Sequence, residues 1–114
     1  LNESAVMPPL EHELDIQQLR ASAEAAGQLL KALANPERLL LLCQLSQGEL
    51  NVTDLEALSG IQQPTLSQQL AVLRRKEMVE TRRAGKQVYY RISSSVALAV
   101  IHVLYQHFCA GDAK

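Results

Sequence analysis

The sequence predicts a mainly α-helical fold with one small β-hairpin, and three observations lead to that fold class. The chain of 114 residues is 47% hydrophobic and 20% charged, which suits one domain with a single core. Apolar residues recur at three- and four-residue spacing along most of the chain. Strand-like alternation with a period of two is confined to residues 79–92. We therefore expect four helices, a hairpin and a final helix, in that order.

The ends of the chain and its apolar runs bound this domain. Residues 1–13 contain Pro8-Pro9, scattered acidic side chains and no apolar period, so we expect a flexible N-terminal arm before a folded domain at 14–114. The sequence has no run of eighteen apolar residues, and it does not begin with a basic segment followed by an apolar run. We therefore expect no membrane span, no secretory signal and a cytoplasmic location.

The first and last helices are predicted to carry more apolar surface than one small core needs. Over residues 15–34, the apolar side chains fall on a single helical stripe: Ile16, Leu19, Ala23, Ala26, Leu30 and Leu33. Residues 93–110 carry two adjacent stripes: Val96, Val100, Val103 and His107, and Ala97, Ile101, Leu104 and Phe108. We expect these two helices to form the interface of a homodimer, because a second copy of the chain would cover the surplus.

The second helix is predicted by the signal at its start. Asn35 is a good N-cap, and Pro36 suits the first helical position because a backbone N–H would have no partner there. We expect this helix to reach about Gln47. Since residues 39–43 are apolar almost all round, Cys43 is expected in or near the core.

Two further helices are expected in the middle of the chain. Thr53 and Glu56 fit a capping box, which predicts a short helix over about 54–59 that stops at Gly60. Pro64 opens the next helix. The inward stripe of that helix consists of Leu66, Leu70 and Leu73. Its outward face near the start is small and polar.

The net charge of −1 hides an uneven distribution of charge along the chain. Residues 1–63 hold three basic and nine acidic side chains, whereas residues 64–91 hold seven basic and two acidic ones. Such a basic block suits a surface that contacts nucleic-acid phosphates, although a solvated basic surface would look the same from charge alone. The block includes the predicted hairpin at 79–92, and this order of elements is that of a winged helix-turn-helix.

Three segments of the chain resemble the ArsR family of bacterial repressors, which is also called ArsR/SmtB. They are residues 30–39 (LKALANPERL), 63–74 (QPTLSQQLAVLR), and the hairpin pair 79–83 (VETRR) with 89–92 (YYRI). The resemblance covers about residues 15–110. It implies a transcriptional regulator, acting as a repressor, that binds double-stranded DNA as a homodimer at an inverted-repeat operator.

Function classes other than DNA binding find little support in the residues. A thiol peroxidase or another enzyme would need a substrate site, and the sequence contains no nucleophile elbow, phosphate-binding loop or carboxylate pair. A pure dimerisation module would not need the basic hairpin. We therefore expect a binding protein and not an enzyme.

The fourth helix and the hairpin supply the expected DNA contacts. In a winged helix-turn-helix, the start of this helix enters the major groove, and the hairpin contacts the backbone or the minor groove. Glutamine can bind adenine with two hydrogen bonds, so base reading is assigned mainly to Gln63 and Gln68. The full set of expected contacts is Gln63, Thr65, Ser67 and Gln68 on the helix, and Arg82, Arg83, Lys86 and Gln87 on the hairpin.

The metal sites that many family members use are missing from this sequence. Where those members read Glu-Leu-Cys-Val-Cys-Asp-Leu, residues 49–55 read Glu-Leu-Asn-Val-Thr-Asp-Leu. Asn51 and Thr53 therefore replace two thiolates, and both have little affinity for soft metals. His102 and His107 are five residues apart on the predicted last helix, so their side chains point in different directions and do not suit one metal site. The sequence predicts neither a metal site nor a cofactor.

Cys43 and Cys109 form the remaining candidate for a signal-sensing site. The pair resembles the sulfide-responsive branch of the family, which includes BigR, SqrR, YgaV and the related HlyU. The resemblance implies that reactive sulfur species such as persulfides act on the two thiols and join them through a disulfide or polysulfide bridge. The bridged protein is then expected to release its operator. Cys109, close to His107, is expected to react first.

Three alternatives to this sensing site stay open in the sequence. Two unrelated buried thiols would look the same, because free cysteine is a common core residue. The same thiols, with or without His107, would also suit a metal- or arsenite-responsive repressor. Finally, HlyU-like members act as activators by displacing another repressor.

Overall fold

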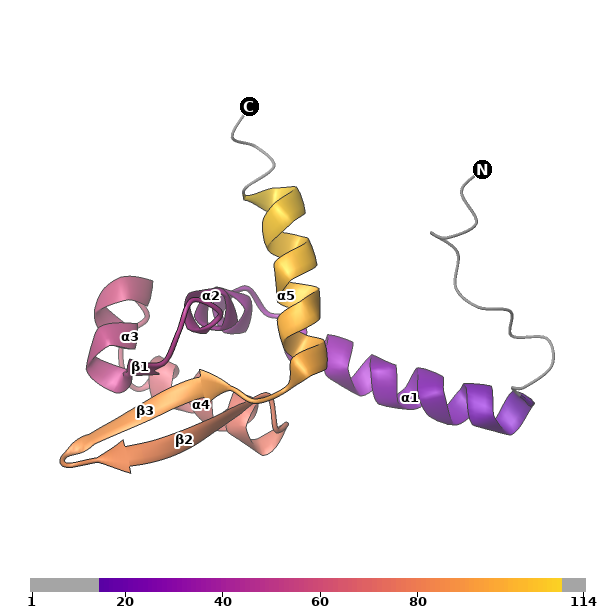
Figure 1. Ribbon diagram of the computed structural model, residues 1–114, viewed down its shortest axis with the longest axis horizontal. Coiled ribbons are helices and arrows are strands. Elements are labelled where there is room, and N and C mark those ends of the chain that lie inside the picture. The colour runs from indigo at the N-terminus through magenta and orange to yellow at the C-terminus, as the bar shows by residue number, and fades with distance from the viewer. Residues whose placement is uncertain (1–14, 110–114) are drawn as a thin grey trace.

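The computed structural model describes residues 15–109, with the elements arranged as in Figure 1. They are α1 (Ile16–Leu33), α2 (Pro36–Leu45), β1 (Leu50–Asn51), α3 (Val52–Ser59), α4 (Thr65–Arg75), β2 (Val79–Ala84), β3 (Gln87–Ile92) and α5 (Ser95–Phe108). The predicted fold class, helices with one small hairpin, is confirmed. The arm expected at 1–13 lies outside the described residues, as do positions 14 and 110–114 of the expected domain. None of the helices described is long and apolar enough to cross a membrane.

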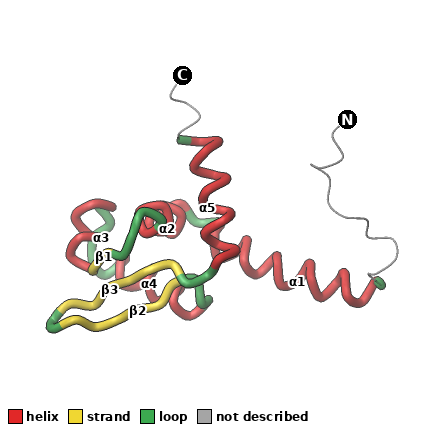
Figure 2. Tube along the Cα trace, viewed as in Figure 1, coloured by secondary structure: helices red, strands yellow, loops and turns green. Residues whose placement is uncertain are grey.

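The small sheet consists of the predicted hairpin and one short strand that the sequence did not reveal. β2 and β3 pair antiparallel from Val79 opposite Ile92 to Ala84 opposite Gln87, and β1 pairs with the other edge of β3. Gly85, with φ 63°, makes the left-handed turn between β2 and β3. The two strands of the hairpin extend beyond the helices as a narrow wing (Figure 2).

The start of α2 agrees with its predicted cap, and its end comes earlier than predicted. The side-chain oxygen of Asn35 accepts the Arg38 backbone N–H at 3.0 Å, and proline is the first helical residue. The helix ends at Leu45, two residues before the predicted end. The Ser46 hydroxyl donates to the Cys43 carbonyl oxygen at 2.6 Å. This side-chain hydrogen bond competes with the backbone hydrogen bond that the same oxygen would accept if the helix continued.

The start of α3 corrects the predicted capping box. Asn51, and not Thr53, caps the helix: its side-chain oxygen accepts the Asp54 backbone N–H at 2.8 Å. β1 leaves Asn51 in extended backbone (φ −88°, ψ 172°), the conformation that an N-cap requires, whereas Thr53 already lies within the helix. The helix therefore begins directly after β1, two residues earlier than predicted.

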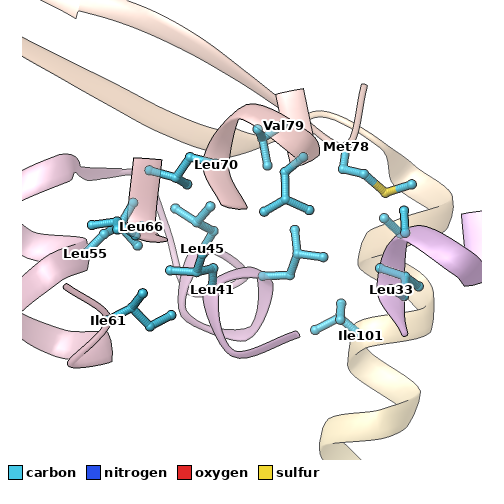
Figure 3. Packing of buried hydrophobic residues seen from close by; sticks show 14 residues of the cluster. Leu33, Leu41, Leu45, Leu55, Ile61, Leu66, Leu70, Met78, Val79 and Ile101 are labelled. Carbon is cyan, nitrogen blue, oxygen red and sulfur yellow. The ribbon is translucent and has the colours of Figure 1, made fainter. Parts of the chain in front are cut away.

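The core lies where α2 and α4 pack together with α3, α5 and the sheet, as Figure 3 shows. α2 and α4 each contribute three buried leucines, which confirms the predicted inward stripe of α4. The core contains Ala32, Leu33, Leu41, Leu42, Leu45, Leu55, Ile61, Leu66, Leu70, Leu73, Met78, Val79, Ala97 and Ile101. Cys43 is half-buried and packs against these residues, as predicted. Because burying one such apolar side chain stabilises by about 1.5–3 kcal/mol, this cluster fixes the helices relative to one another.

α1 and α5 leave much of their apolar surface outside this core. α1 projects away from the other elements in Figure 1, and only Ala32 and Leu33 at its C-terminal end are buried. On α5, only Ala97 and Ile101 of one predicted stripe are buried, and Phe108 at the end of that stripe is exposed. Val96 and Val103 of the other stripe are 58% and 55% exposed. The surplus of apolar surface that the sequence predicted is therefore present on both helices.

Candidate nucleic-acid interface and cysteine pocket

The start of α4 presents exposed polar side chains. Gln63, Ser67 and Gln68 are exposed and Thr65 is half-buried, because the leucines of this helix face the core. The side-chain oxygen of Gln63 accepts hydrogen bonds from the Ser67 backbone N–H at 3.0 Å and from the Ser67 hydroxyl at 2.7 Å. This arrangement orders the first turn and leaves the amide hydrogens of Gln63 as donors. Thr65, Ser67 and Gln68 therefore lie in the first turn of α4, and Gln63, which was predicted on the helix, lies in the turn just before it.

Arg82 on the wing is held by a carboxylate that the sequence analysis did not identify. Its Nε lies 3.0 and 2.9 Å from the two carboxylate oxygens of Glu49, and its Nη2 donates to one of them at 2.8 Å. The guanidinium also lies 4.7 Å from the ring centre of Tyr89. The hydrogen bonds from Arg82 hold the pKa of Glu49 below its ordinary value. Arg82 is thus ordered within the protein, with its side chain still 56% exposed.

The tip of the wing carries the other three predicted contacts. Arg83, Lys86 and Gln87 are exposed, and none of them forms an ion pair or side-chain hydrogen bond within residues 15–109. Nearer the base of the hairpin, Arg91 is paired with Glu80. Two cations of the hairpin, Arg82 and Arg91, are therefore paired with carboxylates. Arg83 and Lys86, nearer the tip, have no ion-pair partner among residues 15–109.

An open groove between α4 and the sheet adds two arginines of the basic block that were not among the individual DNA contacts predicted from the sequence. Its volume is about 460 Å³, and its lining consists of Val52, Ser67, Leu70, Ala71, Arg74, Arg75 and Tyr90. Arg74 and Arg75 belong to the basic block, and both are exposed. Their position on the wall that also carries Ser67 continues the polar surface of α4 toward the wing. The sequence alone does not predict this groove, because Ser67 and Tyr90, which both line it, are far apart along the chain.

On another part of the core, α2 and α5 enclose a pocket that contains both cysteines. The pocket has a volume of about 310 Å³ and is lined mainly by apolar side chains. Its lining consists of Leu39, Cys43, Ile101, Leu104, Tyr105, Phe108 and Cys109. Both thiols are free, with Cys43 half-buried and Cys109 exposed at the end of α5. The fold thus brings together two residues that are 66 positions apart in the sequence.

The environments of the two thiols differ. Burial raises the pKa of the Cys43 thiol, and the neighbouring Cys109 raises it further. A raised pKa keeps Cys43 protonated at neutral pH, and a protonated thiol is a poor nucleophile. Cys109 lies at the exposed edge of the pocket, and His107 is also exposed in the last turn of α5.

The positions associated with metal sites in the family have other roles here. Asn51 caps α3 and Thr53 is exposed in its first turn. His102 and His107 are both exposed on α5. Within residues 15–109, no group of three or more histidine, cysteine, aspartate or glutamate side chains lies close enough together to hold a metal ion.

A helix with an exposed polar start, beside a basic β-hairpin, defines the class of winged helix-turn-helix DNA-binding proteins. Residues 35–81 match the family described as "Bacterial regulatory protein, arsR family", and the chain belongs to this family. The chain is 49% identical over 109 residues to the biofilm growth-associated repressor of Agrobacterium fabrum. That match covers 91% of this chain and 93% of the relative.

Two solved structures extend the similarity to the fold. The transcriptional repressor BigR from Xylella fastidiosa is 45% identical with a TM-score of 0.76, covering 84% of this chain and 98% of that chain. Reduced HlyU from Vibrio cholerae is 39% identical with a TM-score of 0.79, covering 82% of this chain and 99% of that chain. These relatives confirm the predicted family and its BigR- and HlyU-like branch. The chain is a DNA-binding transcriptional regulator rather than an enzyme.

Proposed function

We propose that this regulator binds an inverted-repeat operator as a homodimer and releases it when reactive sulfur species bridge Cys43 and Cys109. The observation that carries the proposal is the apolar pocket that both thiols line. Unrelated core cysteines have no reason to share a pocket, and Cys109 is exposed where a reagent can reach it. One of the similar solved structures is that of HlyU from Vibrio cholerae in its reduced form.

The homodimer is supported by the apolar side chains that the single chain leaves exposed. On α1 and α5 these are Ile16, Leu19, Leu30, Val96, Val103, Tyr105 and Phe108, each between 45% and 73% exposed. Burying apolar surface contributes about 25 cal/mol per Å², so covering these two helices with a second copy is favourable. A symmetric dimer places two α4 helices for two half-sites, which is why an inverted repeat is the expected operator.

DNA recognition is divided between α4 and the wing in this proposal. Gln63, Thr65, Ser67 and Gln68 read base edges and neighbouring phosphates in the major groove, with the two glutamines supplying most of the selectivity. Arg83, Lys86 and Gln87 hold the backbone or the minor groove from the tip of the wing. Arg82 contributes its charge while Glu49 and Tyr89 hold its side chain in place.

The proposed sensing reaction starts at Cys109 and consumes one persulfide, RSSH. The Cys109 thiolate attacks the outer sulfur atom, so an S–S bond forms on Cys109 while the RS–SH bond breaks and RS⁻ leaves. The Cys43 thiol then gives up its proton, attacks the Cys109 sulfur and displaces HS⁻, which takes up the proton to become H₂S. Two thiols are oxidised to a disulfide, and the persulfide is reduced to RSH and H₂S. Each sulfur atom added to the bridge consumes one more RSSH and releases one more RSH.

A bridge between α2 and α5 would act on the spacing of the two DNA-binding units. α2 belongs to the core that holds α4, whereas α5 carries exposed apolar surface for the proposed dimer interface. A coupling free energy of about 1–3 kcal/mol already changes affinity roughly 5- to 150-fold. A disulfide is typically worth about 2–4 kcal/mol, so its constraint is large enough to release DNA.

The test is intact mass spectrometry after glutathione persulfide treatment, with Cys43→Ser and Cys109→Ser treated in parallel. The wild type should lose two hydrogens or gain whole sulfur atoms within one subunit, and each variant should lack the crosslink. Operator binding is measured on the same samples. If zinc or arsenite at stoichiometric concentration releases DNA and persulfide does not, the metal-sensing alternative replaces this proposal. If DNA is released equally well with both thiols replaced, the thiols are not the sensor.

A further inference from the structure

The side chain of Arg38, in the first turn of α2, joins three helices. Its Nε donates to the Ala32 carbonyl oxygen at 2.6 Å, and its Nη2 donates to the Lys31 carbonyl oxygen at 3.4 Å. Both carbonyls lie at the C-terminal end of α1. Its Nη1 donates to the side-chain oxygen of Gln69, on α4, at 3.0 Å. One guanidinium therefore binds α1 and α4 at the same time.

The geometry of these groups makes the connection stiff. A guanidinium is planar, and its five N–H donors point in fixed directions. Gln69 is held at both ends of its amide, because its nitrogen also donates to the Glu37 carboxylate at 3.2 Å. Arg38, Glu37 and Gln69 are all half-buried, which limits competition from water. The last carbonyls of a helix have no partners within it, so Arg38 supplies donors that α1 lacks.

α1 depends on this connection because little else orients it. The helix has 18 residues, and every residue from Ile16 to Gln28 is exposed. Only Ala32 and Leu33 are buried. At 1.5 Å per residue the helix is about 27 Å long, so a tilt of roughly 10° at its buried end moves its far end by about 5 Å. Figure 1 shows how far α1 extends from the remaining elements.

We propose that Arg38 and Gln69 are positioning residues that fix the angle between α1 and α4 and thereby set the half-site spacing that the regulator accepts. This inference rests on the proposed homodimer, in which α1 forms part of the interface. If the two α1 helices pair and Arg38 ties each one to its own α4, the separation of the two α4 helices follows from the network. One base pair inserted between half-sites shifts one of them by about 3.4 Å and roughly a tenth of a turn.

The test measures the preference of the protein for one half-site spacing. The wild type first selects its inverted-repeat operator from random DNA, and fluorescence anisotropy then gives the affinities for that operator and for the same operator with one base pair inserted. We expect the wild type to lose about tenfold in affinity on insertion. In Arg38→Lys, which keeps the charge without the planar fork, and in Gln69→Met, the loss should fall to about twofold. Arg20→Lys, the same substitution at an exposed position of α1, should behave like the wild type.

The ratio of the two affinities separates positioning from simple destabilisation. A variant that is partly unfolded binds both operators more weakly by the same factor, so its preference stays at the wild-type value. If Arg38→Lys fails to fold, Gln69→Met carries the test. Unchanged preference in the folded variants would overturn the inference while leaving the proposed function intact. If the wild type selects no inverted repeat at all, the proposed dimeric binding is what has failed.

Discussion

The wing and the cysteine pocket are built on the same small core and differ in how their reactive groups are arranged. At the tip of the wing, Arg83 and Lys86 are exposed without an ion-pair partner among the described residues. In the pocket, Cys43 and Cys109 share one apolar space between α2 and α5. The first arrangement leaves cations available to a large external anion, and the second brings two thiols to each other.

This difference indicates how DNA binding and the proposed thiol sensing can be kept apart in a chain of 114 residues. Cations serve DNA best when they are solvated and exchangeable, because binding is driven by release of counterions. Two thiols form a bridge best when the fold holds them near each other, because the second attack is then intramolecular. α2 contacts both α4 and α5, so the core between the two regions is the physical route from one to the other.

The largest effect is expected from a substitution in the core that both regions share. Leu41 is fully buried in α2, so Leu41→Ala should lower the free energy of unfolding by about 2–5 kcal/mol and weaken DNA binding and bridge formation together. Urea unfolding of the reduced protein at fixed concentration measures this. Leu58→Ala, at a side chain that is 62% exposed, serves as the control and should change stability by less than about 0.5 kcal/mol. Equal effects from the two variants would contradict the assignment of the core.

A smaller effect should separate base reading from backbone contact. Gln68→Ala is expected to lose about 1–3 kcal/mol of discrimination between the preferred base and its alternatives. Arg83→Ala should weaken binding to all sequences similarly and reduce the slope of log K against log salt by about 0.9. Anisotropy titrations on matched operators at several salt concentrations measure both quantities. The same loss of discrimination in both variants would show that the two roles are not divided between α4 and the wing.

Within the pocket, the two thiols should differ in alkylation rate. At neutral pH, the lone Cys43 of Cys109→Ser should react with iodoacetamide several-fold more slowly than the lone Cys109 of Cys43→Ser. Burial raises the pKa of Cys43 and also restricts access to it. The difference should narrow as the pH rises, because Cys43 then also becomes a thiolate. A faster reaction at Cys43 at neutral pH would reverse the proposed order of attack.

The smallest effect concerns the ion pair between Arg82 of the wing and Glu49. Arg82 lowers the pKa of Glu49 from its ordinary value of 4.5, so the pair stabilises the folded state above that pH and loses its effect as the pH falls through the lower, folded-state pKa. Wild type and Glu49→Gln should therefore differ slightly in melting temperature near neutral pH and converge in acid. High salt should also reduce the difference, because the pair is exposed. If the difference in melting temperature between wild type and Glu49→Gln grew as the pH fell, it would contradict the lowered pKa of Glu49.

Local patterns were sufficient to predict most of the fold. The Asn35 cap, the three buried leucines of α4 and the alternation in the hairpin are all determined by residues within a few positions of one another. The start of α3 was misplaced because β1 is only two residues long, too short for a period to show. Because the sequence does not predict β1, it also does not predict the extended backbone at Asn51 that lets this residue cap α3.

The site could be predicted only in part, for a related reason. The polar start of α4 and the basic hairpin are continuous in sequence, so their residues were found from local composition. The partners of Arg82 and Arg38 lie 33 and 31 residues away, at Glu49 and Gln69. Nothing in the spacing of these residues marks them as neighbours, because their contact depends on how β1 and α4 pack against other elements.

The most direct test of the thiol switch is the operator affinity of one protein sample in its reduced form, in its bridged form, and again after dithiothreitol. Bridging should weaken operator binding by at least about tenfold, and reduction should restore the original affinity. Binding to unrelated DNA should change less, because the wing cations keep their charge in both forms. An operator affinity that is the same in the reduced and bridged forms would contradict the proposal that the bridge between Cys43 and Cys109 controls DNA release.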